Sequence, residues 1–328
     1  MIRARGLART FTARGRSVEA VKGVDIEVTE GELVGFLGPN GAGKTTTLRM
    51  LTTLLRPTAG EAQVAGRDLL ADPVGVRRQI GYVAQGGGVT PEMRVIEEIE
   101  LQGRLYGMSK ADARRRGQEL VEQLDLVNLD QRLTKTLSGG QRRRMDIALS
   151  LVHDPKLIFF DEPTTGLDPQ SRANLWDHIR RLRAERGVTL FLTTHYLDEA
   201  DSLCDRVLVI DNGEIVAEGT PDSLKARVSG DGVTIGVAPE FVGAAAELAG
   251  HLEGAHEVTL GDDVVRFRVP RGDTALPELL RHLDSQGIPM TSMQVHRPTL
   301  DDVFLTLTGR SLRDAEQPRT HEEAAHVA

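Results

Sequence analysis

One segment combines the residue types and the spacing that bind phosphate groups. It reads Gly38-Pro39-Asn40-Gly41-Ala42-Gly43-Lys44-Thr45, fits the template G-x-x-x-x-G-K-[ST], and continues into Thr46. The glycines let backbone N–H groups close around phosphate oxygens, and the helix start adds a positive dipole end. Lys44 supplies a positive charge for the β- and γ-phosphates, while the Thr45 hydroxyl can ligate Mg²⁺. The segment therefore predicts a binding site for a nucleoside triphosphate.

Two adjacent carboxylates follow an apolar run. Residues 157–160 read Leu-Ile-Phe-Phe and are followed by Asp161 and Glu162. Such a run is typical of a central parallel strand, and α/β proteins place ligands at the carboxyl ends of these strands. Asp161 suits a Mg²⁺ contact, and Glu162 can polarise a water for in-line attack on a γ-phosphate. Because the phosphate loop supplies the matching half, this interpretation is favoured over two solvated loop acids.

Two more polar residues stand at predicted strand ends. Gln85 follows the strand predicted for residues 80–84 and precedes three glycines, so it can reach Mg²⁺ or the attacking water. His195 follows the strand predicted for residues 188–193 and can touch a γ-phosphate. Taken alone, His195 would be read as an ordinary loop histidine.

A second anion site is predicted at a helix start. Leu137 is followed by Ser138, Gly139, Gly140 and Gln141, which open a predicted helix. The serine hydroxyl and the free N–H groups of a helix N-terminus can bind an anion. By itself the segment would be an unremarkable helix cap.

Alternating strands and helices must position these groups. Strands are predicted at residues 24–28, 33–37, 61–65, 80–84, 157–161 and 188–193, with a hairpin over 206–218 that turns at Asn212-Gly213. Helices are predicted from Lys44 to Leu55 and from Asp168-Pro169 to Gly187. Residues 89–155 have a helical pattern and are interpreted as an insertion between the halves of an α/β core. Phe11 is predicted to be an edge-strand core residue.

The composition limits the class of protein. The chain has 328 residues, of which 40% are hydrophobic and 27% charged, and this suits about two globular domains. A net charge of −8 argues against nucleic acid as a partner. No apolar run approaches the roughly 20 residues of a membrane helix, so membrane association is expected to go through another protein. The basic runs 114–116 and 142–144 are interpreted as solvated helix faces, and Cys204 as a packed side chain.

Taken together, these motifs resemble the nucleotide-binding domain of ABC transporters. The Leu-Ser-Gly-Gly-Gln pentapeptide at 137–141 is the most specific of them, and Gly166-Leu167-Asp168 completes the set in the order of the family. The resemblance covers residues 1 to about 227. It implies an α/β fold with a P-loop NTPase (RecA-like) core and an inserted helical subdomain at about residues 89–155.

The resemblance also implies roles for individual residues. They are adenine stacking for Phe11 (a position that is usually tyrosine), Mg²⁺ sensing and permease coupling for Gln85, γ-phosphate contacts across a dimer for Ser138 and Gly140, Mg²⁺ binding for Asp161, general base for Glu162 and γ-phosphate switch for His195. It further implies hydrolysis of ATP with Mg²⁺ and a head-to-tail homodimer around two ATP molecules. That homodimer would dock on a separate transmembrane permease at the cytoplasmic face of the cell membrane.

The C-terminal part has a different pattern. Strands near 233–237, 258–269 and 290–295 and helices near 239–252 and 275–286 give the order βαββαβ, a small α+β domain of ferredoxin-like character over residues 228–310. Thr299 and Asp302 are a predicted cap pair, and residues 311–328 a flexible tail. With its Pro-Thr-Leu-Asp-Asp-Val-Phe ending, this part resembles the daunorubicin-resistance group of ABC ATPases, which implies export of a drug, antibiotic or lipid-like compound.

Three other ATPase classes share the core motifs. Chromosome-organising ATPases carry long heptad-patterned segments that this chain lacks, and translation-associated ATPases carry two motif sets where this chain has one. An importer ATPase stays open from the core alone and is disfavoured only by the C-terminal resemblance. A non-enzymatic binding module would need a damaged Lys44 or Glu162, and both are present.

Overall fold

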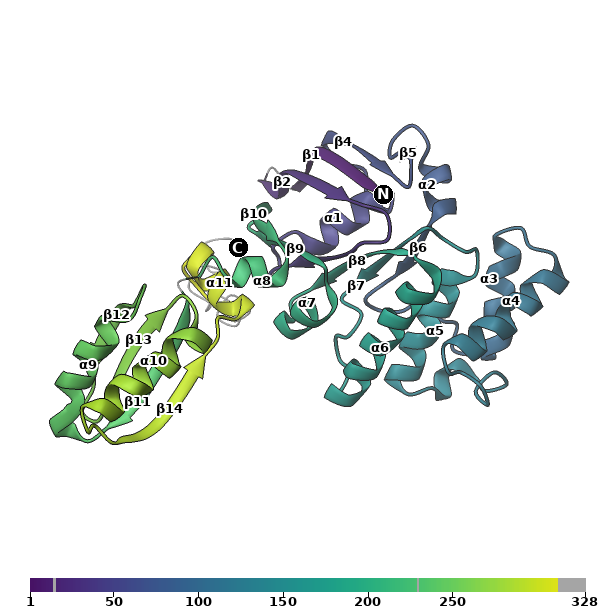
Figure 1. Cartoon of the computed structure of the whole chain (residues 1–328). Helices are drawn as coiled ribbons and strands as arrows, with labels where there is room; N and C mark the ends of the chain where they lie inside the picture. The colour runs from purple at the N-terminus through teal and green to yellow at the C-terminus, as the bar shows by residue number, and fades with distance from the viewer. Residues whose placement is uncertain (14–15, 229, 312–328) are drawn as a thin grey trace. The chain divides into compact units, whose positions relative to one another are not determined.

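The computed structural model describes residues 1–13, 16–228 and 230–311 (Figure 1). The described residues divide into two compact units, 1–221 and 222–311, and each has its own hydrophobic core. The domain limits predicted from the sequence, 1–227 and 228–310, stay predictions. Apart from residue 311, the predicted tail lies outside the described residues.

The first unit is built on a six-stranded sheet. Its strand order is β10 (Glu214–Gly219), β9 (Arg206–Asp211), β3 (Leu33–Leu37), β8 (Thr189–Thr194), β7 (Leu157–Asp161) and β6 (Ile80–Val83). Only β10 is antiparallel to its neighbour, and β3, β7 and β8 are buried along their whole length. Parallel strands present their carboxyl ends at one edge, so the segments after β3, β6, β7 and β8 meet there. The predicted P-loop NTPase core is confirmed.

A second, antiparallel sheet covers one side of this core. Its order is β2 (Arg16–Val28), β1 (Ile2–Ala13), β4 (Ala59–Val64) and β5 (Arg67–Asp68). Helix α1 (Lys44–Leu51) contacts strands of both sheets and is therefore held between them (Figure 1). The helix ends four residues earlier than predicted, because Thr53 adopts a left-handed φ of 65°.

The prediction for Phe11 is wrong. Its strand, β1, lies between β2 and β4 and is not an edge strand, yet the Phe11 side chain is 40% exposed. The pairing of β1 with β4 ends at Ala8, so nothing in that strand covers Phe11. The Arg9 guanidinium lies 4.7 Å from the centre of the Phe11 ring and is a cation–π partner. Phe11 is therefore a surface aromatic residue of this unit.

Helices fill the rest of the first unit. They are α2 (Pro73–Gln79), α3 (Val95–Leu105), α4 (Lys110–Gln123), the 3-10 turn η1 (Thr134–Thr136), α5 (Gly139–Leu151), α6 (Pro169–Arg186) and α7 (Leu197–Leu203). Ser109 and Asp168 cap α4 and α6 by accepting hydrogen bonds from backbone N–H groups. One face of α6, with Leu175, Ile179 and Leu182, is buried. Leu120 on α4 is buried, whereas Val127, which lies beyond the end of α4 at Gln123, is 52% exposed.

The second unit has the predicted βαββαβ order. After α8 (Pro221–Lys225) its elements are β11 (Asp231–Val237), η2 (Pro239–Phe241), α9 (Val242–Gly250), β12 (His256–Leu260), β13 (Val264–Val269), α10 (Gly272–Ser285), β14 (Met290–His296) and α11 (Leu300–Thr308). The sheet order β12-β13-β11-β14, antiparallel throughout, is that of a ferredoxin-like fold. Thr299 and Asp302 form the predicted capping box of α11.

The one cysteine of the sequence is packed as predicted. Cys204 follows α7, is 7% exposed, and its Sγ would lie 2.6 Å from a Cβ added to Gly35. Burial raises the pKa of the Cys204 thiol well above its usual range. Among the described residues, no helix has the length and apolar character needed to cross a membrane.

Candidate nucleotide-hydrolysis site

The loop between β3 and α1 can be built only with glycine at two positions. A Cβ on Gly38 would lie 2.2 Å from the carbonyl oxygen of Ile210, and one on Gly43 would lie 2.6 Å from that of Ala20. Gly43 also has a φ of 107°, which L side chains rarely adopt. The loop therefore passes close to neighbouring backbone and leads into the N-terminus of α1, as expected for a phosphate cradle.

Lys44 is buried at the foot of this loop, where it is 4% exposed. Its Nζ donates hydrogen bonds to the carbonyl oxygens of Gly38 at 2.7 Å and Pro39 at 3.1 Å. The remaining candidates of the segment surround it. Ala42 is buried, Thr45 and Thr46 are half-buried in the first turn of α1, and Asn40 and Gly41 are exposed. The charge of Lys44 is thus fixed at the base of the cradle.

The Glu162 carboxylate contacts three other candidate residues, which come from distant parts of the chain. Its carboxylate lies 3.3 Å from Lys44 Nζ and 3.5 Å from His195 Nδ1, and it accepts a 2.8 Å hydrogen bond from Gln85 Nε2. The Thr165 hydroxyl donates a further bond at 3.3 Å. Burial raises the pKa of Glu162, but the neighbouring His195 ring and the charge of Lys44 outweigh it and lower that pKa to about 2. The carboxylate is therefore ionised at neutral pH.

This pKa predicts a pH dependence of stability. The folded-state pKa of Glu162, about 2, lies below the ordinary value of 4.5. The ionised carboxylate therefore stabilises the fold above the ordinary value, and this contribution is lost as the pH falls towards the folded-state value. The quantity to follow is the unfolding free energy of the parent chain minus that of Glu162→Gln, which cannot titrate at this position. We expect this difference to stay constant above about pH 6 and to decrease below about pH 4. Denaturant unfolding of both chains measures this difference, and an unchanged difference down to about pH 3 would contradict the prediction.

Asp161 is held beside the phosphate loop. Its Oδ1 accepts hydrogen bonds from the hydroxyls of Thr45 at 3.0 Å and Thr193 at 2.9 Å, and the Tyr82 hydroxyl lies 3.5 Å from Oδ2. Asp161 itself is 1% exposed. Thr193 and Tyr82 were not singled out in the sequence. The sequence signal that could have marked Thr193 is a hydroxyl at the end of an otherwise apolar strand.

Arg143 is a further residue that sequence reasoning missed. It lies on α5 and is 6% exposed, so the interpretation of run 142–144 as a solvated face is wrong at this position. Its guanidinium donates to the carbonyl oxygens of Ala84 at 2.6 Å, Pro163 at 2.7 Å and Asp161 at 3.2 Å. These carbonyls flank Gln85 and Glu162, so Arg143 ties the helix that starts at Ser138 to both sides of the site.

Lysine is expected to be a poor substitute for Arg143. The ammonium keeps the charge, but it places all its donors on one atom and cannot reach three separate carbonyls. We expect Arg143→Lys to destabilise the chain by about 2 kcal/mol and to lower kcat more than it raises KM. Denaturant unfolding and steady-state ATPase assays measure both effects. The exposed neighbour Arg142→Lys is the matched control, and equal behaviour of the two variants would refute the positioning role.

The signature residues lie apart from this cluster. Ser138 caps α5 in a capping box with Gln141, and Gly139 and Gly140 form the first turn of the helix. Ser138, Gly140 and Gln141 border a hollow of about 440 Å³ whose other walls come from Asp125, Arg144 and α6. The structure thus brings together Lys44, Thr45, Gln85, Asp161, Glu162 and His195, but not Phe11 or the signature.

Family models match both units of the chain. The "ABC transporter" model matches residues 21–165, and the model "ATP-binding protein DrrA1-3-like, C-terminal domain" matches residues 219–308. An AAA-domain model also matches residues 135–197. The two halves of the chain therefore carry the two domains that the sequence resemblance implied.

Curated relatives align along almost the whole chain. The daunorubicin resistance ATP-binding protein DrrA3 of Streptomyces coeruleorubidus is 43% identical over 301 residues, which is 91% of this chain and 94% of that protein. The doxorubicin resistance ATP-binding protein DrrA of Mycobacterium tuberculosis (strain ATCC 25618 / H37Rv) is 42% identical over 309 residues, 92% of each chain.

Solved structures agree with the sequence relatives. The dimeric structure of a post-hydrolysis state of the ATP-binding cassette MJ0796 bound to ADP and Pi has a TM-score of 0.62 and 28% identity. It covers 67% of this chain and 98% of that chain. The resemblance inferred from the motifs is confirmed. The chain is an ATPase that belongs to the ATP-binding proteins of ABC transporters, in the daunorubicin and doxorubicin resistance group.

Proposed function

We propose that this chain hydrolyses ATP to drive export of a drug, antibiotic or lipid-like compound through a separate permease. The observation that carries the proposal is the convergence of Lys44, Gln85 and His195 on the Glu162 carboxylate, next to a phosphate cradle. The direction and the cargo class are supported by relatives whose names record daunorubicin and doxorubicin resistance.

Glu162 is proposed as the general base. A base with a pKa near 2 is weak, and the Lys44 charge contributes to that low value. When Lys44 turns to the β- and γ-phosphates, it leaves Glu162, and the carboxylate pKa rises towards the range that a base needs. Gln85 and His195 then hold the carboxylate and the attacking water in place. The site thereby makes the base stronger when a triphosphate is bound.

The donor set around Asp161 fits Mg²⁺. Thr45 Oγ1 and Asp161 Oδ1 lie 3.0 Å apart at the phosphate loop, and Mg²⁺ prefers oxygen donors. Within the described residues, no group of three or more His, Cys, Asp or Glu side chains could hold a metal ion alone. Mg²⁺ bound with ATP commonly takes one or two carboxylates plus substrate phosphates, so this is no obstacle. We assign Thr45, Asp161 and Gln85 as its ligands, and the bound ion would neutralise developing phosphate charge.

Two chains are proposed to share each nucleotide. Ser138, Gly140 and Gln141 border a hollow separate from the chain's own phosphate loop. Together with Gly139 in the same helix turn, they suit a nucleotide held by a partner subunit. A head-to-tail pair around a two-fold axis places both halves against two ATP molecules. The dimeric MJ0796 cassette bound to ADP and Pi supports this arrangement. Phe11 is proposed to stack on the adenine, for which its exposed ring is available.

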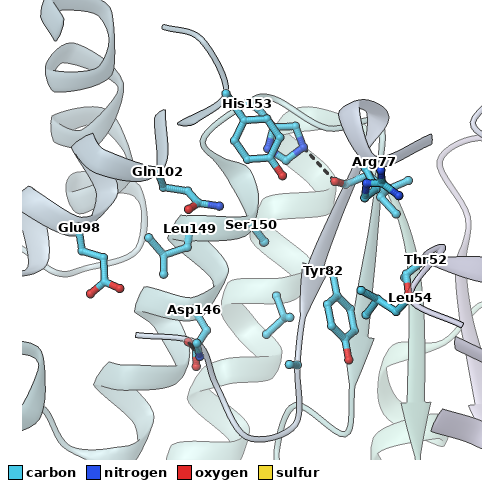
Figure 2. Close-up of a pocket in the computed structure, with 15 residues that line it drawn as sticks. Thr52, Leu54, Arg77, Tyr82, Glu98, Gln102, Asp146, Leu149, Ser150 and His153 are labelled. Atoms are coloured by element: carbon cyan, nitrogen blue, oxygen red, sulfur yellow. Dashed lines mark hydrogen bonds between the residues drawn. The ribbon is translucent and has the colours of Figure 1, made fainter. Parts of the chain in front are cut away.

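The permease is proposed to bind near residues 85–106, which places the chain at the cytoplasmic face of the membrane. Figure 2 shows a pocket in this part of the first unit, with side chains from α3, β6 and α5 around it. Tyr82 lines the pocket, and its hydroxyl lies 3.5 Å from Asp161. The Tyr82 side chain therefore belongs both to the proposed docking pocket and to the nucleotide site. Charge reversals in this segment that leave transport intact would count against the assignment.

Drug extrusion from cells that carry this chain together with its permease tests the proposal. We expect extrusion to be lost in Lys44→Ala and retained in Lys156→Ala, an exposed lysine outside the site. Persistent extrusion by a Lys44→Ala chain that has no ATPase activity would contradict the proposed function. ATP-dependent movement of the compound into the cell would instead assign the chain to an importer.

A further inference from the structure

The pocket near β6 has an acidic end. It has a volume of about 370 Å³, and its walls include Glu98 on α3 and Asp146 on α5. Figure 2 shows both carboxylates at one end of the pocket and His153 towards the other. Burial raises the pKa of the Glu98 carboxyl, and the nearby charge of Asp146 adds to that rise. The pocket therefore concentrates negative charge in a buried place.

Glu98 keeps an oxygen without a partner. The side chain is 6% exposed, and Oε1 accepts a 2.7 Å hydrogen bond from the backbone N–H of Thr90. Its other oxygen, Oε2, is buried and has no hydrogen-bond partner among the described residues. A buried carboxylate oxygen without a donor is unfavourable, and most such groups in proteins are satisfied. Glu98 therefore presents an acceptor that another molecule can use.

Arg143 balances only one of the two carboxylates. Its Nη1 forms a buried ion pair with Asp146 Oδ2 at 3.8 Å, while the guanidinium hydrogen bonds go to three carbonyl oxygens. The other hydrogen bond to Asp146 comes from the backbone N–H of Gly88 at 3.1 Å. Arg77, which also lines the pocket, donates to the Thr53 hydroxyl. Among the ion pairs of residues that the structure describes, Glu98 is thus left without a cationic partner.

The remaining walls suit the aliphatic part of a long side chain. Leu54 and Tyr106 line the pocket and are 58% and 40% exposed, and Leu149 lies among the lining residues. The Tyr106 ring stacks on His153 with 3.8 Å between ring centres, which leaves a flat surface. Lysine and arginine combine an apolar stem with a charged tip, and aromatic faces attract their cations.

We propose that this pocket receives a lysine or arginine side chain from a cytoplasmic helix of the permease, with its charge paired to Glu98 beside Asp146. The inference rests on the proposed function, because it takes the permease as the partner. It adds the chemistry of the contact: a basic side chain at the centre of the docking helix, and apolar residues around it that cover Leu54 and Tyr106.

Glu98→Gln tests the pairing with little change of shape. The amide oxygen of glutamine can still accept from the Thr90 N–H, but its NH₂ group replaces the unpartnered oxygen and presents donors to the incoming cation. Binding of the co-expressed, detergent-solubilised permease is measured for the parent chain, Glu98→Gln and Glu122→Gln, an exposed glutamate on α4 outside residues 85–106. We expect Glu98→Gln to weaken binding at least about tenfold, Glu122→Gln to leave it unchanged, and the ATPase activity of the free chains to be equal.

A charge exchange completes the test. Lysines and arginines in the cytoplasmic helices of the permease are replaced by glutamate one at a time and paired with Glu98→Lys. We expect one replacement to restore binding to Glu98→Lys. If Glu98→Gln binds like the parent chain, the carboxylate has no cationic partner and this inference alone is overturned. If the parent chain binds no permease, both the proposed function and this inference are overturned.

Discussion

Replacing Glu162 by glutamine is expected to lower kcat for ATP hydrolysis by about 10²- to 10⁴-fold, the range attributed to a positioned general base. Glutamine keeps the shape and can still contact Gln85 and His195, but it cannot accept the proton of the attacking water. ATP affinity should be retained, because Lys44 loses its competing carboxylate partner, 3.3 Å away, and is free for phosphate. ATP should therefore accumulate unhydrolysed and stabilise the dimer.

Single-turnover hydrolysis, equilibrium ATP binding and light scattering measure the three quantities. Glu32→Gln is the matched control, since Glu32 precedes β3 at the end of the sheet opposite the site and is bonded to Arg206. It should leave kcat within about twofold. An unchanged turnover rate in Glu162→Gln would refute the assignment of the base, whatever the dimer does.

Replacing Ser138 by arginine is expected to abolish turnover while each chain still binds ATP. Ser138 is exposed at the start of α5 and outside the Glu162 cluster, so the substitution should spare the chain's own phosphate loop. An arginine there would block the nucleotide held by the partner subunit. The loss of the helix cap costs about 1 kcal/mol, which a folded chain tolerates. Ser138→Thr keeps the cap and is the control for stability.

Mixing variants distinguishes a shared site from a damaged fold. Lys44→Ala and Ser138→Arg should each be inactive alone. In a mixed dimer, the Ser138→Arg chain contributes an intact phosphate loop and the Lys44→Ala chain an intact signature, so one complete site forms. If the two sites act independently, the mixture should regain roughly a quarter of the parent activity. Full activity of Ser138→Arg alone would show that the signature does not contact nucleotide.

Sequence reasoning located the groups whose motif fixes both residue type and position. Asp161 and Glu162 lie at and just after the end of β7, and Lys44 follows the loop after β3. Both strands are buried without interruption, and parallel strands bring their carboxyl ends to one edge of the sheet. Gln85 and His195 were placed by the same rule, and the structure brings both within 3.5 Å of Glu162. The ferredoxin-like order of the second unit could likewise be predicted from the alternation of strands and helices in the sequence.

The residues that were missed depend on contacts between distant segments. Arg143 looks like one of three exposed arginines, and only the fold brings the carbonyls of Ala84 and Pro163 to its guanidinium. Phe11 has the pattern of a core residue, but its burial depends on where the pairing with β4 stops, and no local signal marks that point. Periodicity shows which side of a strand a residue faces, but not what lies opposite.

The packing of Cys204 against Gly35 makes this protein suitable for site-specific labelling with thiol reagents. Because the chain's own thiol is buried and its pKa is raised, alkylating reagents should spare it under native conditions. Fluorophores or spin labels could then be attached to a cysteine introduced on the surface without first removing the natural one. Reaction of Cys204 itself would report unfolding of the sheet around it.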